Sequence, residues 1–165
     1  MEIWSGGQTG VDRAAFDAAL EAGVPIRGWI PRGRAAEDGT VPEQYAGLAE
    51  TETAEYSVRT ERNVRDSDAT LILTMGEPTG GTEVTRRLAM AYERPVLVLD
   101  LAEMSVAGAV ALAVEWCEYL PRPLKLNVAG PRASRAPEVY ALARQVVAGV
   151  ITGFMNPTQF GGSIA

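Results

Sequence analysis

The segment Ile3-Trp4-Ser5-Gly6-Gly7-Gln8-Thr9-Gly10, close to the start of the chain, decides the fold class. Its first residues have the composition of a short strand, and the glycines that follow form a turn. A helix is expected from Val11 to about Ala22, because its apolar residues recur at helical spacing and Gly23 suits a helix end. Thr9 and Asp12 have the spacing of a capping box at its start. The sequence therefore begins with a strand, a glycine-rich turn and a helix.

The same alternation of strand and helix continues along the chain. Further strands are expected at Ile26–Ile30, Ala69–Thr74, Val96–Leu99 and Leu124–Ala129, and helices at Ser57–Ser67, Glu83–Glu93, Ser105–Tyr119 and around residues 139–150. Val96–Leu99 is uninterrupted in its apolar character, which is typical of a strand buried on both faces. Residues 32–56 are acidic and rich in glycine, and they predict a long loop.

About five such alternations predict the class α/β, as a single-domain Rossmann-like three-layer sandwich. Its sheet is expected to be mainly parallel, with about five strands and with helices on both faces; the order of the strands is left open. Residues 1–152 are assigned to this domain and residues 153–165 to a C-terminal extension. A length of 165 residues agrees with one domain, since domains average roughly 150 residues.

Composition excludes several classes of function. The 15 basic and 21 acidic residues give a net charge of −6, which is opposite in sign to the charge that general nucleic-acid binding requires. The chain has no histidine, so Ser-His-Asp triads and histidine-ligated metals are excluded. The single Cys117 can neither close an internal disulfide nor build a cysteine-rich metal site. No long apolar segment or signal peptide is recognised, so we expect a cytoplasmic protein without a membrane partner.

Glycine-rich turns follow four of the predicted strands, at Ser5–Gly10, Pro31–Gly39, Gly76–Thr82 and Gly130–Ser134. Loops that follow the strands of an open parallel sheet lie at one edge, where ligands bind next to the point at which strand order reverses. Glycine allows an anion to approach the backbone N–H groups, and the start of the following helix adds partial positive charge. These turns therefore predict a site for a phosphate or another oxyanion, with tight turns alone as the alternative.

Side chains in these turns supply further candidates. Gln8 and Thr9 offer polar donors, whereas the arginines could pair with an anion in a bidentate manner. The candidate ligand-binding residues are Ser5, Gly6, Gly7, Gln8, Thr9, Gly10, Arg32, Arg34, Gly80, Gly81, Thr82 and Arg132.

Other kinds of site have less support. The first turn lacks G-x-G-x-x-G spacing, and the second predicted strand ends in Ile30-Pro31-Arg32 rather than in an acidic residue, so NAD binding is weakly indicated. Lys125 is the only lysine, which excludes a P-loop. Asp66 and Asp68 are more typical of a helix end than of a metal pair, and no protein-ligated metal is predicted. Glu83 is a candidate catalytic carboxylate, or an acidic residue that suits a helix start.

Five segments of the chain resemble one known family: Ser5–Ala15, Gly28–Gly39, Asn63–Asp68, Thr79–Thr82 and Leu126–Arg132. Together they are similar to the putative molybdenum carrier family, and the likeness extends to about residue 150. That family belongs to a wider Rossmann-like group of nucleotide-sensing or nucleotide-processing proteins, which includes the phosphoribohydrolases once labelled lysine decarboxylases.

The resemblance implies a Rossmann-like fold, a small phosphorylated ligand of pterin or nucleotide type, such as molybdenum cofactor or a nucleotide, and assembly as a homo-oligomer. The related hydrolases carry P-G-G-x-G-T-x-x-E. In this chain the corresponding stretch is Pro78–Thr85, with Thr85 at the position of the motif's glutamate and Glu83 directly after the threonine. This departure puts hydrolase activity in doubt.

Three hypotheses follow for the function. The first is a binding protein, a carrier or sensor that holds the phosphate or oxyanion part of molybdenum cofactor or of a nucleotide at the glycine-rich turns. The second is an enzyme that hydrolyses the N-glycosidic bond of a nucleoside monophosphate, with Glu83 activating water. The third is a non-catalytic interaction module that contacts a protein through its acidic loop.

Overall fold

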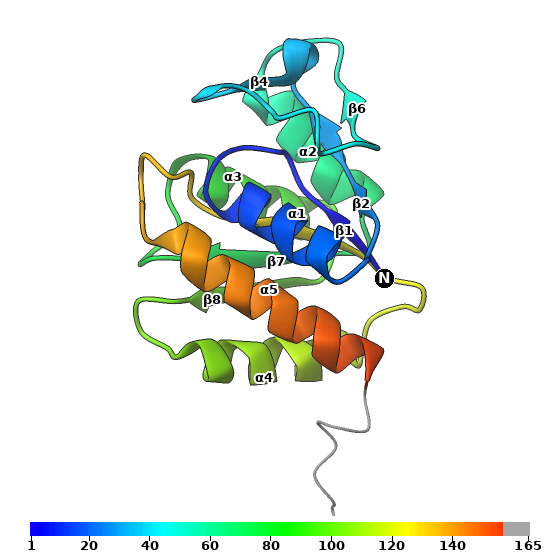
Figure 1. The fold of residues 1–165 in the computed structure, drawn as a ribbon, viewed down its shortest axis with the longest axis vertical. Helices are drawn as coiled ribbons and strands as arrows, with labels where there is room; N and C mark the ends of the chain where they lie inside the picture. Colours follow the sequence, from blue (N-terminus) through cyan, green and yellow to red (C-terminus); the bar gives the residue numbers. More distant parts are fainter. Residues whose placement is uncertain (157–165) are drawn as a thin grey trace, which may run out of the picture.

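A five-stranded parallel sheet forms the centre of the computed structural model, which describes residues 1–156 (Figure 1). Its strands lie in the order β2 (Ile26–Arg27), β1 (Glu2–Trp4), β9 (Lys125–Ala129), β7 (Ala69–Thr74) and β8 (Val96–Asp100). The helices α1 (Val11–Glu21), α4 (Val106–Cys117) and α5 (Val139–Met155) pack on one face of the sheet, and α2 (Tyr56–Asp66) and α3 (Gly80–Ala91) pack on the other. The predicted α/β class and the three-layer Rossmann-like arrangement are confirmed.

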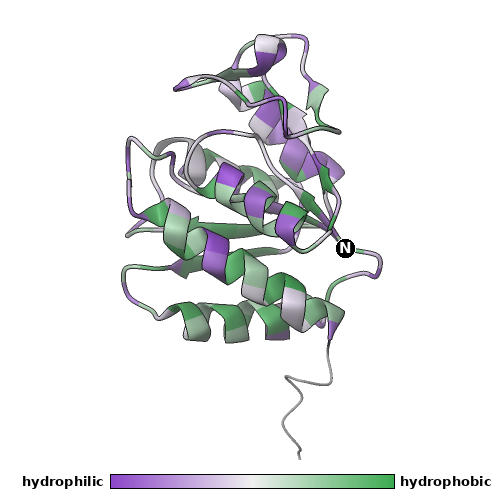
Figure 2. Ribbon diagram, in the orientation of Figure 1, coloured by the Kyte–Doolittle hydropathy of each residue, from purple (hydrophilic) through white to green (hydrophobic). Residues whose placement is uncertain are grey.

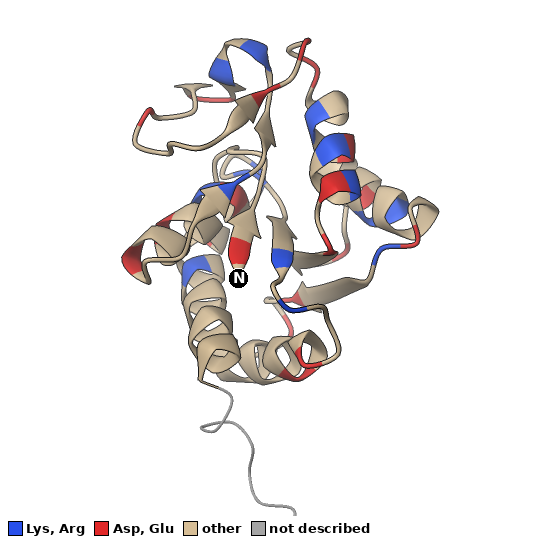
Figure 3. Ribbon diagram, turned by 90° about the vertical axis from the view of Figure 1, so that its right-hand side faces the viewer, with Lys and Arg blue, Asp and Glu red and all other residues tan. Residues whose placement is uncertain are grey.

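The core lies between the sheet and the helices. Every residue of β7 is buried, and so are the apolar faces of α1 and α5. Apolar residues concentrate in the sheet, α4 and α5, while α2 is hydrophilic along much of its length (Figure 2). Charged residues are correspondingly sparse on α4 and α5 (Figure 3). Burial of this apolar surface is the main stabilising contribution to the fold.

No helix within residues 1–156 is both long and apolar enough to span a bilayer.

The second predicted strand is interrupted at Gly28. β2 stays in the central sheet, whereas β3 (Trp29–Ile30) leaves it and pairs with β6 (Ala49–Glu50) in a second sheet. Gly28 has a φ of 132°, and a Cβ there would lie 2.2 Å from the carbonyl oxygen of Ser5. The side chain of Asn63 holds the redirected strand, because it accepts a hydrogen bond from the Trp29 N–H and donates one to the Trp29 carbonyl, both at 2.8 Å. The expectation of one continuous strand was wrong.

The acidic segment that follows is folded against the body of the molecule. It contains a 3-10 turn at Arg32–Arg34 and a hairpin of β4 (Ala35–Ala36) and β5 (Gly39–Thr40). Four of its six acidic residues bind within the chain: Glu37 to Thr9 and Ser134, Asp38 to Arg13, Glu50 to the Gly33 N–H, and Glu52 to Arg62. The long predicted loop is therefore partly ordered structure, and most of its carboxylates already have partners.

Three other features differ from the sequence prediction: the burial of one strand and the bounds of two helices. β8 is an edge strand with four of its five residues only half-buried, so the expectation that Val96–Leu99 is buried on both faces was wrong. A run of apolar residues cannot distinguish an edge strand, covered by helices, from a central one. α3 begins at Gly80 rather than at Glu83. α5 continues to Met155, beyond residue 152, and residues 157–165 of the predicted C-terminal extension lie outside the described residues.

Candidate functional site

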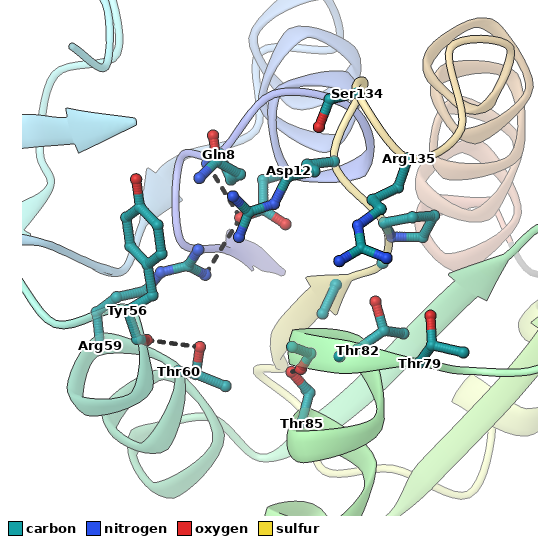
Figure 4. A pocket seen from close by; sticks show the side chains of 16 residues that line it. Gln8, Asp12, Tyr56, Arg59, Thr60, Thr79, Thr82, Thr85, Ser134 and Arg135 are labelled. Atoms are coloured by element: carbon teal, nitrogen blue, oxygen red, sulfur yellow. Dashed lines mark hydrogen bonds and ion pairs between the residues drawn. The ribbon is translucent and has the colours of Figure 1, made fainter. Parts of the chain in front are cut away.

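The loops that follow β1, β7 and β9 meet at the carboxyl edge of the sheet around a cavity of about 290 Å³. The cavity lies where the order of the strands reverses, since the chain runs from β1 outward to β2 on one side and from β7 outward to β8 on the other. Its walls are formed by residues of the three loops and of α2: Gln8, Asp12, Tyr56, Arg59, Thr60, Thr79, Gly80, Gly81, Thr82, Thr85, Ala129, Gly130, Pro131, Arg132, Ser134 and Arg135 (Figure 4).

The first glycine-rich turn is occupied by a carboxylate of the protein itself. Asp12 is 4% exposed, and its Oδ2 accepts a hydrogen bond of 3.1 Å from the Gln8 N–H. Burial raises the pKa of Asp12 above its usual value, although Arg59 and the Gln8 amide oppose the shift. The predicted capping box was wrong, because Gly10 is the N-cap residue, Asp12 turns back to Gln8, and the Thr9 hydroxyl donates to Glu37. An external anion at this turn would have to displace Asp12.

The glycines of this turn serve the packing of the chain. A Cβ on Gly6 would lie 1.9 Å from the guanidinium of Arg59, and one on Gly10 would lie 2.4 Å from the Pro131 carbonyl oxygen. Gly7 has a φ of 74° and packs against apolar side chains. Ser5 is fully buried and its hydroxyl donates to the Val128 carbonyl at 2.7 Å. These four residues lie under the site and do not line the 290 Å³ cavity.

The glycine-rich turn at Gly76–Thr82 is open. A Cβ on Gly80 or Gly81 would meet nothing within 4 Å, and both residues line the cavity at the start of α3. The first turn of a helix has N–H groups without intrahelical acceptors, and the helix dipole makes this end partially positive. Thr82 and Thr85 continue the same wall one turn into the helix. Backbone access for an anion is therefore available at α3 rather than at α1.

Three guanidinium groups, of Arg59, Arg132 and Arg135, line the cavity. Arg59 reaches Asp12 at 3.4 Å, and its side chain is only 13% exposed. The ring of Tyr56 lies beside two of these cations, with its centroid 5.7 Å from Arg59 and 5.2 Å from Arg132. Burial lowers the pKa of Arg59, and repulsion from Arg132 adds to this shift against the attraction of Asp12. A bound anion would relieve both effects.

Two polar atoms at this site are buried without a partner. Among residues 1–156, the buried side-chain nitrogen and oxygen atoms that lack a hydrogen bond are Nε2 of Gln8 and Nε of Arg59. Both belong to residues that line the cavity, and both are donors. Gln8 is 5% exposed, and its Oε1 already accepts from the N–H groups of Thr9 and Glu37. Buried donors are nearly always satisfied in native proteins, so this unpaired set favours a further acceptor at the site, either a water molecule or a ligand atom.

The remaining predicted residues lie elsewhere. Thr9 is next to the cavity and not among its lining residues, and its hydroxyl accepts from the Ala133 N–H at 3.1 Å. The guanidinium of Arg34 binds the carbonyls of the segment 41–45, and Arg32 lies exposed in the 3-10 turn. Glu83 pairs with Arg86 and Arg87, each at 2.7 Å, and their hydrogen bonds lower its pKa to about 2. None of these residues lines the cavity.

Sequence reasoning missed several residues of the site, above all Asp12 as an internal anion and Arg59 on α2. The charged pattern of α2 resembles that of any solvated helix, and α2 is far in sequence from the glycine-rich turns. Nothing local therefore indicates that Arg59 belongs to the site.

Within the described part of the chain, no three His, Cys, Asp or Glu side chains come together in an arrangement that could hold a metal ion.

A parallel sheet with a polar, arginine-rich cavity at its switch point defines a Rossmann-like protein with a candidate ligand site. The sequence model of the Circularly permutated YpsA SLOG family matches residues 3–151, and the chain belongs to this family. It is also similar to the crystal structure of "Putative molybdenum carrier protein" from Syntrophus aciditrophicus SB at 1.45 Å resolution, with 43% identity and a TM-score of 0.84 over 93% of this chain and 94% of that chain. A search of curated proteins found no match.

The permutation named in the family description is visible in the strand order. If β9 and α5 were placed before β1, the order β2-β1-β9-β7-β8 would be that of a doubly wound sheet numbered 3-2-1-4-5. The loop after β9 then corresponds to the first loop of an unpermuted fold. This loop contributes Gly130, Pro131 and Arg132 to the cavity. The site thus occupies the same position in the sheet as the ligand crevice of the unpermuted Rossmann arrangement.

Proposed function

We propose that the protein binds a small phosphorylated ligand of pterin or nucleotide type and acts as a carrier or sensor of it. In this proposal the phosphate or a similar oxyanion lies in the 290 Å³ cavity, between Gln8, Arg59, Arg132 and the start of α3. The name of the structural neighbour refers to molybdenum, so molybdenum cofactor is a candidate cargo together with nucleotides.

The observation that carries the proposal is the pair of buried, unpartnered donors on Gln8 and Arg59. An unsatisfied buried donor costs about 1–3 kcal/mol, and more when it is charged. An anion in the cavity would reduce the repulsion between Arg59 and Arg132, and it would accept from both donors once the side chains of Gln8 and Arg59 turn toward it. A neutral, apolar ligand would leave these costs in place. The chemistry of the donors therefore favours a phosphate group over an uncharged one.

The hydrolase hypothesis has less support from the same geometry. Glu83 has both carboxylate oxygens bound to arginines, and its lowered pKa makes it a weak base. Thr85, at the position of the hydrolase glutamate, lines the cavity, and its hydroxyl donates to the Gly81 carbonyl at 2.9 Å. Incubation with a panel of nucleoside monophosphates is expected to release no free base. Sustained release that Glu83→Gln abolishes would contradict the proposed binding function.

Arg132→Gln is expected to weaken the binding of GMP about 10- to 100-fold, because one charge-assisted hydrogen bond contributes roughly 1.5–3 kcal/mol. Isothermal titration calorimetry with GMP and with guanosine would measure this effect. The affinity for guanosine, which lacks the phosphate, should change little. Arg144→Gln is the matched control, since Arg144 pairs with Glu21 at the end of α1 and does not line the cavity. Equal losses for GMP and guanosine would mean that Arg132 does not contact the phosphate.

Gly81→Val is expected to weaken GMP binding at least about tenfold, or roughly 1.4 kcal/mol, because its side chain would cover the backbone at the start of α3. The fold should tolerate the change to within about 1 kcal/mol, since a Cβ at Gly81 meets nothing within 4 Å. Gly81→Ala should show a smaller loss of affinity. Unchanged affinity in the valine variant would contradict an anion site at this helix start.

A further inference from the structure

A second cavity, of about 150 Å³, adjoins the first at the carboxyl edge of the sheet. The two cavities share Thr79, Thr82, Pro131 and Arg135, so one elongated ligand can occupy both. The remaining wall of the second cavity comes from the loop after β7 and the start of the segment before α5: Thr74, Met75, Glu77, Pro78 and Ala136.

The two cavities differ in charge. Arg135 lines both cavities. The first adds Arg59 and Arg132, with the single carboxylate of Asp12. The second adds the carboxylate of Glu77 together with the apolar groups of Met75, Pro78 and Ala136. A phosphate would be repelled by Glu77, and a flat ring with N–H donors would be attracted to it. The ring of Tyr56 in the first cavity already lies beside Arg59 and Arg132. The heterocyclic end of a ligand therefore fits the second cavity best.

The loop that carries Glu77 is held in place from the neighbouring strand. The carboxylate of Asp100, at the end of β8, accepts a hydrogen bond of 2.8 Å from the Gly76 N–H, and Gly76 has a φ of 90°. Arg86 on α3 is close enough to Glu77 for a weak electrostatic attraction. Its guanidinium, however, binds Glu83 at 2.7 and 2.8 Å. Glu77 thus lines the second cavity at an exposed position, where its carboxylate is available to a ligand.

We propose that the second cavity recognises a 2-amino-4-oxopyrimidine edge, the adjacent ring N–H and amino group that guanine and pterin share, through the carboxylate of Glu77. This inference rests on the proposed function, because the phosphate in the first cavity brings the ring to the second. A carboxylate accepts two parallel N–H bonds from such an edge. Hypoxanthine lacks the amino group and keeps one of these bonds, whereas adenine presents a ring nitrogen lone pair to the carboxylate.

Isothermal titration calorimetry of the full chain with GMP, IMP, AMP and 6-hydroxymethylpterin phosphate tests this assignment. GMP and the pterin phosphate are each expected to bind at least about tenfold more tightly than IMP, and AMP more weakly still. Glu77→Gln should remove most of the preference for GMP over IMP, because the variant keeps only one neutral acceptor, and it should lower the affinity for IMP less than the affinity for GMP. Glu118→Gln, at an exposed position beyond α4, should retain the wild-type preference.

The outcomes separate this inference from the proposed function. Equal affinities for GMP and IMP, or a preference for GMP that survives Glu77→Gln, would overturn recognition by Glu77 while phosphate binding stands. Absence of binding by all four phosphates would overturn the proposed function and this inference with it. The tighter binder of GMP and the pterin phosphate shows whether the recognised edge belongs to a guanine or to a pterin. Either result supports recognition of the 2-amino-4-oxopyrimidine edge.

Discussion

Asp12→Ala is expected to lower the free energy of unfolding by about 3–5 kcal/mol, because it leaves the buried guanidinium of Arg59 without its partner. The variant also removes the acceptor of the Gln8 N–H, which lies in the same buried turn. Asp12 is 4% exposed, so water cannot readily replace the lost carboxylate. For a chain of this size the melting temperature should fall by about 6–20 °C. Urea denaturation followed by circular dichroism would measure the change.

Two further variants separate the causes of this effect. Asp12→Asn keeps an acceptor for the Gln8 amide and removes only the charge, so its loss should be smaller than that of Asp12→Ala. Asp38→Asn removes a carboxylate that pairs with Arg13 at a more exposed position, where such pairs contribute about 0–1 kcal/mol. A loss below about 1 kcal/mol for Asp12→Ala would show that the first turn does not depend on an internal anion.

Arg59→Met is expected to reduce the affinity for GMP about 100-fold or more, since it removes a largely desolvated cation from the proposed phosphate site. The single variant should also lose stability, because it leaves Asp12 buried without Arg59. The double variant Asp12→Asn, Arg59→Met removes both charges and should recover most of that stability. Its affinity for GMP should nevertheless remain as low as that of Arg59→Met. Calorimetric titration together with thermal melting gives both quantities.

The double variant distinguishes a structural role of Arg59 from a binding role. If Arg59 only balances the charge of Asp12, the double variant should bind GMP as well as the wild type does. Recovery of stability together with persistent loss of binding would support direct contact between Arg59 and the phosphate. Recovery of both would contradict the position assigned to the ligand.

The class of the fold could be predicted from sequence because strand and helix differ in the period of their apolar residues. Each alternation is a local signal, and the loops after parallel strands must lie at one edge. The sequence also indicated that the turn containing Gln8, the turn containing Gly81 and the turn containing Arg132 would meet, and the structure brings them to one cavity. The family resemblance read from these segments is confirmed.

Features that depend on contacts between distant residues could not be predicted. The strand over residues 26–30 breaks at Gly28 because of the Ser5 carbonyl, and nothing in the strand itself indicates this contact. The glycines at positions 6 and 10 looked like an anion site, but they make room for Arg59 and for the Pro131 carbonyl. Asp12 binds the Gln8 N–H within the first turn, and the fold brings Arg59 of α2 beside its carboxylate. Glycine in a turn therefore indicates close approach without specifying what approaches.

Other expectations stay predictions. Assembly as a homo-oligomer was implied by the family resemblance, and cytoplasmic location followed from the absence of a recognised signal. An external anion was expected to bind at Ser5, Gly6, Gly7, Thr9 and Gly10. These residues lie beneath or beside the cavity, which favours a role in supporting its walls. In the proposed site the ligand contacts Gln8, Arg59 and the start of α3 instead.

The most direct test is a crystal structure of the full chain grown with saturating GMP. We predict that the phosphate lies in the 290 Å³ cavity, within hydrogen-bonding distance of Gln8 Nε2 and of the guanidinium groups of Arg59 and Arg132. The carboxylate of Asp12 should remain bound to the Gln8 N–H. A phosphate that displaces Asp12 from the first turn, or that binds away from Gln8 and Arg59, would contradict the account.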